Sequence, residues 1–157
     1  MPAATGPFFR KGVTKFIACP SVANPAAPTR AEITAGTVLT GITAISGFQI
    51  TNSPVDTGDL DSRFVSNVPG EDKAGSSSLT FKDKRNTEST SIRAALAKDT
   101  NLVIIYMPYG DIPTQRCETW PATSTGVNDK IDMSAAASYE VGFSIPSPPT
   151  QNAVIPA

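Results

Sequence analysis

The amino-acid sequence predicts a mainly β fold, a β-sandwich or flattened barrel with one flanking α-helix, extended N- and C-terminal arms and a long central loop. Several segments are rich in Thr, Ile and Val, which favour strands. Only residues 88–98 carry a convincing helical pattern. The 14 prolines and 11 glycines gather mainly at the ends and in one central stretch, where they interrupt regular structure.

The length of 157 residues suits a single domain over residues 1–157. A chain of this size buries enough core to need neither disulfides nor a structural metal. Residues 1–12 contain two prolines and two glycines, and we expect them to form an N-terminal arm. The stretch from Val13 to Cys19 predicts a first strand. Residues 20–31 contain three prolines and cannot form a helix or a central strand.

Residues 36–51 are rich in Thr and Ile and predict further strand structure, with bends or bulges at Gly41 and Gly47. Residues 52–76 are polar and rich in turn formers, with Phe64 in the middle, and predict a long loop. A structureless segment of this length is unusual within a compact domain, so we expect the loop to serve a partner.

Residues 78–82 alternate between polar and apolar side chains and predict a half-buried strand. Residues 88–98 predict the helix, because Ile92, Ala95 and Leu96 recur at helical spacing.

The remaining strands are expected at residues 102–107, 114–122 and 139–145. The first is continuously apolar, and the last alternates most clearly of all. Three prolines then end regular structure, and residues 146–157 predict a C-terminal arm.

Charge is unevenly distributed along the chain, although the net charge is only −1 and creates no overall field for nucleic acid. Residues 1–30 carry four basic side chains and no acidic one. Residues 31–72 carry six acidic side chains and Arg63 as their single base. A basic arm and an acidic loop could attract each other between copies; the alternative is ordinary solvated charge.

The residues for common enzyme chemistry are absent. The sequence has no histidine, which is the commonest general base and metal ligand. It contains neither G-x-x-x-x-G-K-[ST] nor G-x-G-x-x-G, the two glycine-rich motifs that bind phosphates. Its two cysteines, Cys19 and Cys117, lie far apart in sequence and do not form a zinc pair, so we expect buried thiols. The sequence predicts no enzyme, no cofactor and no metal.

The acidic residues of the central loop do not match a calcium site. Asp56, Asp59 and Asp61 lie close together, but Arg63 stands where the EF-hand pattern needs an oxygen ligand. We expect a solvated acidic loop.

Three other side chains could have either a functional or a purely structural role. Glu118 and Glu140 could pair as glycosidase carboxylates, but fit ordinary strand surface better. Trp120 is the single tryptophan and is expected to anchor a core or an interface.

No apolar run approaches the ~20 residues of a membrane span.

The passage from Pro28 to Thr40 resembles the major tail proteins of siphophages of actinobacteria. Further short motifs follow in similar order, and their order and spacing carry the resemblance over residues 10–146. These motifs are Ile45–Phe48, Asp59–Phe64, Val68–Gly70, Ser78–Phe81 and Tyr139–Phe143.

The resemblance implies a structural subunit of a bacteriophage tail tube. In that family, subunits of this fold form rings, typically six-fold, which stack into a hollow conduit for DNA. It implies that the chain binds copies of itself, and that the tube meets a tape measure protein, a tail terminator and a distal tail protein. DNA would pass without specific binding. The protein would belong to the virion tail, assembled in the host cytoplasm, without a membrane.

The arms and the central loop are the expected inter-ring contacts. The candidate contact residues are Phe8, Phe9, Arg10, Lys11, Asp56, Asp59, Asp61, Arg63 and Phe64. Glu118 and Glu140 are candidates for the channel surface, because acidic side chains do not grip phosphate.

Two alternatives remain at this point. One is the inner tube of a contractile injection system or tailocin, which shares the fold. The other is an immunoglobulin-like adhesion or capsid-decoration module, which would form no long polymer.

Overall fold

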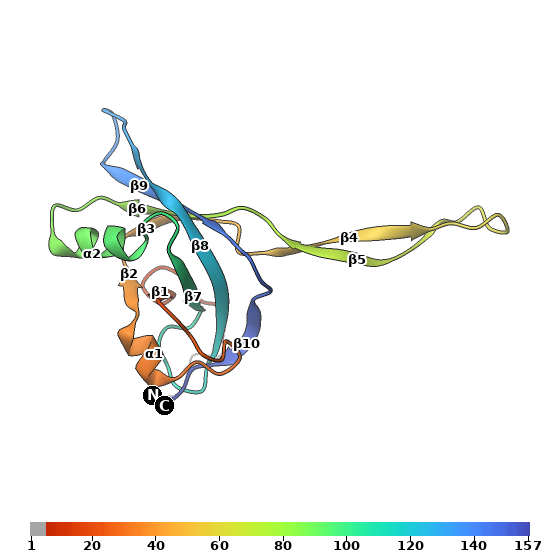
Figure 1. The fold of residues 1–157 in the computed structure, drawn as a ribbon, viewed down its shortest axis with the longest axis horizontal. Helices are drawn as coiled ribbons and strands as arrows, with labels where there is room; N and C mark the ends of the chain where they lie inside the picture. Colours follow the sequence, from red (N-terminus) through yellow and green to blue (C-terminus); the bar gives the residue numbers. More distant parts are fainter. Residues whose placement is uncertain (1–5) are drawn as a thin grey trace.

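The computed structural model describes residues 6–157 and consists of a β-rich body from which one long hairpin projects (Figure 1). The elements are β1 (Lys15–Cys19), α1 (Arg30–Ala35), β2 (Thr37–Leu39), β3 (Ile42–Ser46), β4 (Ile50–Thr57), β5 (Ser66–Ala74), β6 (Ser77–Lys82), α2 (Thr87–Ala95), β7 (Asn101–Met107), β8 (Arg116–Lys130), β9 (Ser138–Ser144) and β10 (Thr150–Val154).

Eight strands form one sheet in the order β2-β1-β7-β8-β9-β6-β3, and β10 pairs with β8. The first and last strands of this order, β2 and β3, follow each other in the chain and are separated only by Thr40 and Gly41. Gly41 has a φ of +73°, which a glycine adopts without strain. The sheet therefore curls back on itself, which confirms the predicted flattened barrel.

The strands predicted at 78–82, 102–107 and 139–145 correspond to β6, β7 and β9. The strand predicted at 114–122 is longer than expected, since β8 continues to Lys130. Its polar second half is a strand because it pairs with β9 from Thr123 to Lys130. Tertiary pairing thus extends a segment whose own side chains give no clear strand pattern.

The main hydrophobic core lies inside the curled sheet. Alternate residues of β1 point to opposite sides, so Phe16 and Ala18 join this core and Ile17 and Cys19 join a second one. Trp120 on β8 is fully buried in the main core, and Phe48 meets its ring edge-on at 5.7 Å. Trp120 is therefore a core anchor.

The second core lies on the other face of β1, β7 and β8, beneath α1 and the C-terminal segment. Helix α1 was not predicted from the sequence. The helix begins with a capping box. The Thr29 hydroxyl accepts a hydrogen bond from the Glu32 amide, and the Glu32 carboxylate accepts one from the Thr29 amide. Ile33 then packs beneath the helix with 4% exposure.

The C-terminal arm is only partly an arm. Residues 150–154 form β10 on the edge of β8, and Ala153 and Ile155 are buried in the second core. From the sequence, regular structure was expected to end at the prolines of residues 146–149. The prolines end β9, but Ala153 and Ile155 beyond them are buried in the second core, because burial of apolar side chains is favourable.

The helix predicted at residues 88–98 is α2, which packs on the sheet with Ile92 and Leu96 in the main core. Its cap is Asn86, whose side chain accepts a hydrogen bond from the Ser89 amide at 3.1 Å. Arg93 fastens the helix to the sheet by ion pairs with Asp83 at 3.0 Å and Asp129 at 2.6 Å.

The predicted loop at residues 52–76 is corrected by the structure, because β4 and β5 form a two-stranded sheet there. Only residues 58–65 at the far end form a loop. The prediction was wrong because Pro54 and Pro69 disfavour a central strand. A two-stranded ribbon has two free edges, so a proline with no N–H to donate is tolerated there. The ladder also shifts register between Ser53 and Val55.

Candidate functional site

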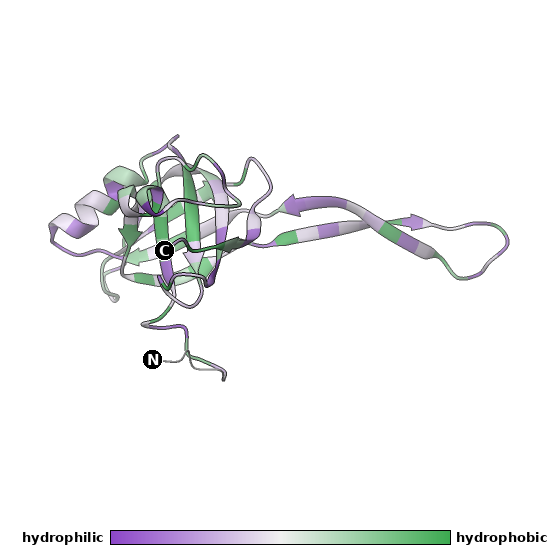
Figure 2. Ribbon diagram, turned by 90° about the horizontal axis from the view of Figure 1, so that it is seen from below, coloured by the Kyte–Doolittle hydropathy of each residue, from purple (hydrophilic) through white to green (hydrophobic). Residues whose placement is uncertain are grey.

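The hairpin β4–β5 leaves the body and ends far from it (Figures 1 and 2). All of β4 is exposed, and β5 is exposed at every position except Gly70 and Ala74, which are half-buried. The side chain of Asn52 bridges the strands by donating to the Gly70 carbonyl at 3.0 Å and accepting from the Gly70 amide at 3.2 Å. A hairpin without a core of its own is marginally stable in water. It is therefore suited to packing against another molecule.

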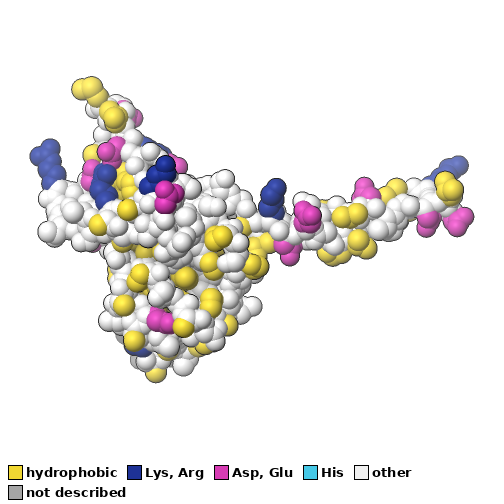
Figure 3. All heavy atoms as spheres, in the orientation of Figure 1, with side chains coloured by type: hydrophobic (Ala, Val, Ile, Leu, Met, Phe, Trp, Pro, Cys, Tyr) yellow, Lys and Arg dark blue, Asp and Glu magenta, His cyan; other side chains and the backbone are white. Residues whose placement is uncertain are grey.

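The tip of the hairpin, residues 58–65, combines acidic and large apolar side chains (Figure 3). Leu60 is 106% exposed and Phe64 is 78% exposed. Asp59 shapes the turn, because its carboxylate accepts hydrogen bonds from the Asp61 and Ser62 amides at 3.1 and 3.0 Å. Fully exposed Leu and Phe on a protruding loop are typical of a docking element.

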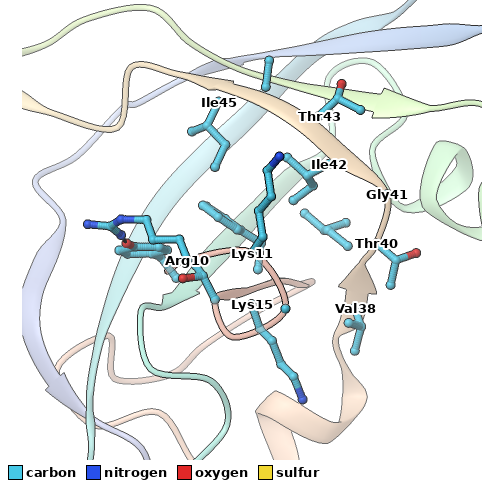
Figure 4. Close-up of a pocket in the computed structure, with 15 residues that line it drawn as sticks. Arg10, Lys11, Lys15, Val38, Thr40, Gly41, Ile42, Thr43 and Ile45 are labelled. Carbon is cyan, nitrogen blue, oxygen red and sulfur yellow. Dashed lines mark hydrogen bonds between the residues drawn. The ribbon is translucent and has the colours of Figure 1, made fainter. Parts of the chain in front are cut away.

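A groove of about 550 Å³ runs along the body between the start of β1, the edge of β2 and the edge of β3 (Figure 4). It lies where the curled sheet fails to close, so both flanking strands have a free edge. Its apolar lining includes Phe16, Val38, Ile42, Ile45 and Tyr106. Free strand edges next to exposed apolar side chains invite pairing with another chain.

Basic side chains surround this groove. Arg10, Lys11 and Lys15 contribute to its lining, which contains no acidic residue. Arg10 donates a hydrogen bond to the Tyr106 hydroxyl, and Lys11 lies 5.8 Å from the Phe9 ring centre. Within the described residues, neither Lys11 nor Lys15 forms an ion pair. Their charges remain available to an acidic partner.

The outer face of β3, β6 and β9 carries short side chains. The register places Ser46 beside Ser78 and Ser78 beside Gly142, and residues paired across antiparallel strands share a face. Ala44 lies on the same face, one pair further along. These four positions comprise exposed Ala44 and Ser46 on β3 and half-buried Ser78 and Gly142, with no charge among them.

A family profile described as "Phage tail tube protein" matches residues 1–157. The chain belongs to the phage tail tube protein family. No curated protein matches this tail tube protein, so its other likenesses come from solved structures.

Three solved structures share the fold of this tail tube protein at low identity. A chain of the sheath-tube complex of an extracellular contractile injection system, PVC, has 13% identity and a TM-score of 0.59, with 98% of this chain and 95% of that chain covered. A chain of the tail of an empty GTA particle with C6 symmetry has 13% identity and a TM-score of 0.56, covering 90% and 95%. A chain of the six-fold symmetrised anti-feeding prophage baseplate has 9% identity and a TM-score of 0.55, covering 94% and 97%.

The predicted contact residues of the tail tube protein fall into two separate groups. Phe8, Phe9, Arg10 and Lys11 lie beside the body, whereas Asp56 to Phe64 lie at the end of the hairpin. Phe8 packs on Tyr109 with ring centres 5.3 Å apart, and Phe9 is 73% exposed. The rest of the predicted N-terminal arm, residues 1–5, lies outside the described residues.

The two glutamates predicted for the channel point to opposite faces of the sheet. Glu118 is on the inner face, where it accepts a hydrogen bond from Trp120 Nε1 at 3.1 Å and pairs with Arg116 at 3.3 Å. Glu140 alternates with buried Tyr139 and Val141, so it faces outward, and it pairs with Lys130 at 2.9 Å. Alternation along the strands therefore prevents both from lining one surface.

Both cysteines are free and buried in the second core, as predicted. Burial raises the pKa of the Cys19 thiol and of the Cys117 thiol to about 11. In the part of the chain that the structure describes, no cluster of three or more His, Cys, Asp or Glu residues could hold a metal ion. Nor does any helix between residues 6 and 157 have the length and apolarity needed to span a bilayer.

The groove was not predicted from the sequence, although Arg10 and Lys11 were. Its other wall consists of Thr43 and Ile45 on β3, which gave a strand signal but no functional one. Gly41 was expected to mark a bend or bulge. The β3–β6 ladder shifts register next to it, between Ile42 and Ala44. Folding places this edge opposite the basic arm.

Proposed function

We propose that this protein is the structural subunit of a phage tail tube, forming rings that stack into a hollow conduit for DNA. The observation that carries the proposal is the exposed β4–β5 hairpin together with the unpaired edges of β2 and β3. Free strand edges are satisfied when a segment of another copy pairs with them, which favours assembly over the isolated subunit. A projecting hairpin adds head-to-tail contacts along an axis, which build an open-ended polymer.

Six subunits in each ring is the symmetry we propose. The tail of the empty GTA particle has C6 symmetry, and the anti-feeding prophage baseplate was six-fold symmetrised. Their chains share this fold. The role we infer is mechanical, with no catalytic residue and no cofactor.

We assign the channel surface to the outer face of β3, β6 and β9. The opposite outer face, on β1, β7 and β8, forms the second core with Ile33 of α1 and with Ile155, whereas Ala44 and Ser46 of the small polar face are exposed. Ser46, Ser78 and Gly142 offer DNA phosphates no cation. The margin of this face carries both signs of charge, because Glu140 pairs with Lys130 at 2.9 Å and exposed Lys82 continues the Ser78 face of β6. Glu118 is not proposed for the channel.

The variant Ser78→Arg tests this surface. It should leave tube formation intact but place a ring of cations in the channel, so that tubes retain added short DNA at low salt. Wild-type tubes and a Ser91→Arg control on the exposed face of α2 should retain at least ten-fold less. Equal DNA retention by the two variants would remove the assignment.

In a complete tail, the tube would enclose a tape measure protein and end on the tail terminator and distal tail proteins. It would be assembled in the host cytoplasm as part of the virion. We favour the non-contractile, siphophage type on the sequence resemblance. The inner tube of a contractile system has the same fold, and a sheath gene beside this one would decide for it.

Electron microscopy of the purified, concentrated protein is the decisive experiment. We expect hollow filaments of uniform width, with a six-fold average in cross-section. A particle that stays monomeric at every concentration tested would reject the proposal and favour an adhesion or capsid-decoration module.

A further inference from the structure

We propose that the hairpin tip of one subunit, residues 58–65, docks into the basic groove between β1, β2 and β3 of a second copy. This inference rests on the proposed function and specifies which surfaces join neighbouring subunits of the tube. Four features of the structure support it: reach, charge, apolar surface and unpaired strand edges.

The tip cannot reach the groove of its own subunit. β4 has eight residues, which at about 3.3 Å per residue carry the tip roughly 26 Å from its root. The hairpin points away from the body, and the groove lies on the body beside β1 and β3 (Figures 1 and 4). Any partner for the tip is therefore on another molecule.

The two surfaces have opposite charge. The tip and the strand end beside it carry Asp56, Asp59 and Asp61 against Arg63 alone. The groove lining carries Arg10, Lys11 and Lys15 with no acidic residue. Opposite potentials steer the encounter of two surfaces and fix their orientation. The same arrangement opposes pairing of two tips or of two grooves.

The apolar groups also match. Leu60 and Phe64 project from the tip almost without cover. The groove of about 550 Å³ is open, and Val38 and Ile45 at its walls are 48% and 52% exposed. Docking would remove all four side chains from water together, which is favourable in proportion to the area covered. Apolar anchors surrounded by charge are the usual anatomy of a specific interface.

The free edges of β2 and β3 complete the fit. Each strand pairs on only one side, so its outer N–H and C=O groups face the groove region unpaired by another strand. The tip backbone can supply partners for these groups while its side chains enter the groove. The contact is head-to-tail, because every subunit offers one tip and one groove, so it can repeat from subunit to subunit along the tube.

Cysteine crosslinking in assembled tubes tests the placement directly. Leu60→Cys on the tip and Thr43→Cys on the groove wall should together give a ladder of disulfide-linked subunits that a reductant removes. The native thiols should react little near neutral pH, because burial raises the pKa of Cys19 and Cys117 to about 11.

The matched control combines Leu60→Cys with Ser91→Cys, an exposed site on α2. We expect at least ten-fold less ladder from it. An equal ladder from the control, or no ladder from the Thr43 pair in well-formed tubes, would overturn the docking. A ladder only from a Cys at position 9 or 154 would place the tip on the arms instead.

Charge reversal provides a second test. Asp56→Lys with Asp61→Lys reverses the tip and keeps Asp59, whose carboxylate shapes the turn. Lys11→Glu with Lys15→Glu reverses the groove. Each pair alone should reduce the tube mass that sediments by at least ten-fold, and the four changes together should restore it to within three-fold. Lys98→Glu and Glu71→Lys are controls on exposed sites outside both surfaces.

The outcomes separate this inference from the proposed function. If the wild type forms no tubes, the proposed function fails and the docking fails with it. If the wild type forms tubes but the quadruple variant is no better than the single-surface variants, the docking alone is wrong. Unchanged thermal unfolding of each variant excludes misfolding as the cause of a loss.

Discussion

The body and the hairpin of this tail tube protein use β-structure in opposite ways. In the body, β1, β7 and β8 are covered on both faces, and Trp120, Ile104 and Ile105 have no exposed surface. In the hairpin, every residue of β4 is exposed. The body is stabilised by its own apolar cores. The hairpin has no comparable core and is held within the subunit by its own ladder and by the Asn52 side chain.

Shortening the hairpin should abolish assembly without changing the stability of the body. Replacing residues 52–72 with Asn-Gly joins the paired residues Thr51 and Lys73 through a two-residue turn. We expect no tubes by electron microscopy, while the urea midpoint of the monomer stays close to that of the wild type. Normal tubes from this variant would show that the hairpin is dispensable for assembly.

The substitution Trp120→Ala should lower the stability of the body, which the shortened hairpin leaves unchanged. It removes a fully buried ring from the main core, and such changes lower the free energy of unfolding by about 3–5 kcal/mol. Urea denaturation followed by circular dichroism measures the loss. The exposed Phe64→Ala is the matched control, and its unfolding free energy should change by less than about 0.5 kcal/mol.

Two glycines allow the same substitution in each region. A Cβ at Gly36 would lie 2.6 Å from Ile17 Cγ2 and 2.8 Å from Cys19 Sγ, so Gly36→Ala should destabilise the body by about 1–3 kcal/mol. A Cβ at Gly70 would overlap the Ser53 carbonyl oxygen across the hairpin. Gly70→Ala should therefore leave the unfolding free energy of the body unchanged and reduce tube formation. Equal effects of the two changes on urea unfolding would contradict the independence of the regions.

The smallest expected effect is a pH dependence confined to the body. Hydrogen bonds from the Ala23 and Thr29 amides hold the pKa of Glu32 below its ordinary value of 4.5. Because the folded pKa is the lower one, the charged form stabilises the fold above pH 4.5. That stabilisation is lost as the pH falls through the folded pKa.

Thermal unfolding between pH 7 and about pH 3 checks this effect. The wild type should lose slightly more Tm than Glu32→Gln, which keeps an acceptor for one amide but does not titrate in this range. Glu71→Gln on exposed β5 should follow the wild type. If Glu32→Gln also follows the wild type, the capping box carries no pH-dependent stability.

Local patterns in the sequence predicted most of the body. The alternation of Tyr139, Val141 and Phe143 and the apolar run of residues 102–107 each correspond to a strand with the expected buried side chains. Helix α1 was missed although its signal is present, since Thr29 and Glu32 have capping-box spacing. The three prolines before it are typical of a loop, and a helix of six residues is too short for a periodic apolar stripe.

The hairpin and the groove were beyond sequence reasoning for a different reason. Residues 52–76 have few apolar side chains because no core of this subunit covers them, so no period predicts a strand. The contact residues Arg10 and Asp61 were named from charge alone, but which residues oppose each other depends on how the sheet curls. Glu118 and Glu140 illustrate the same limit, because the face of each depends on the strand register.

The sequence by itself determined the fold class, helix α2 and most strands of the body, and the separation of basic and acidic segments along the chain. These follow from local periodicity and composition, which are written in neighbouring residues. Only the tertiary structure decided that the central segment projects as a hairpin, that the C-terminal segment returns to cover a core, and that a basic groove opens between β1 and β3. Each of these depends on contacts between residues far apart in the chain, and no local pattern encodes them.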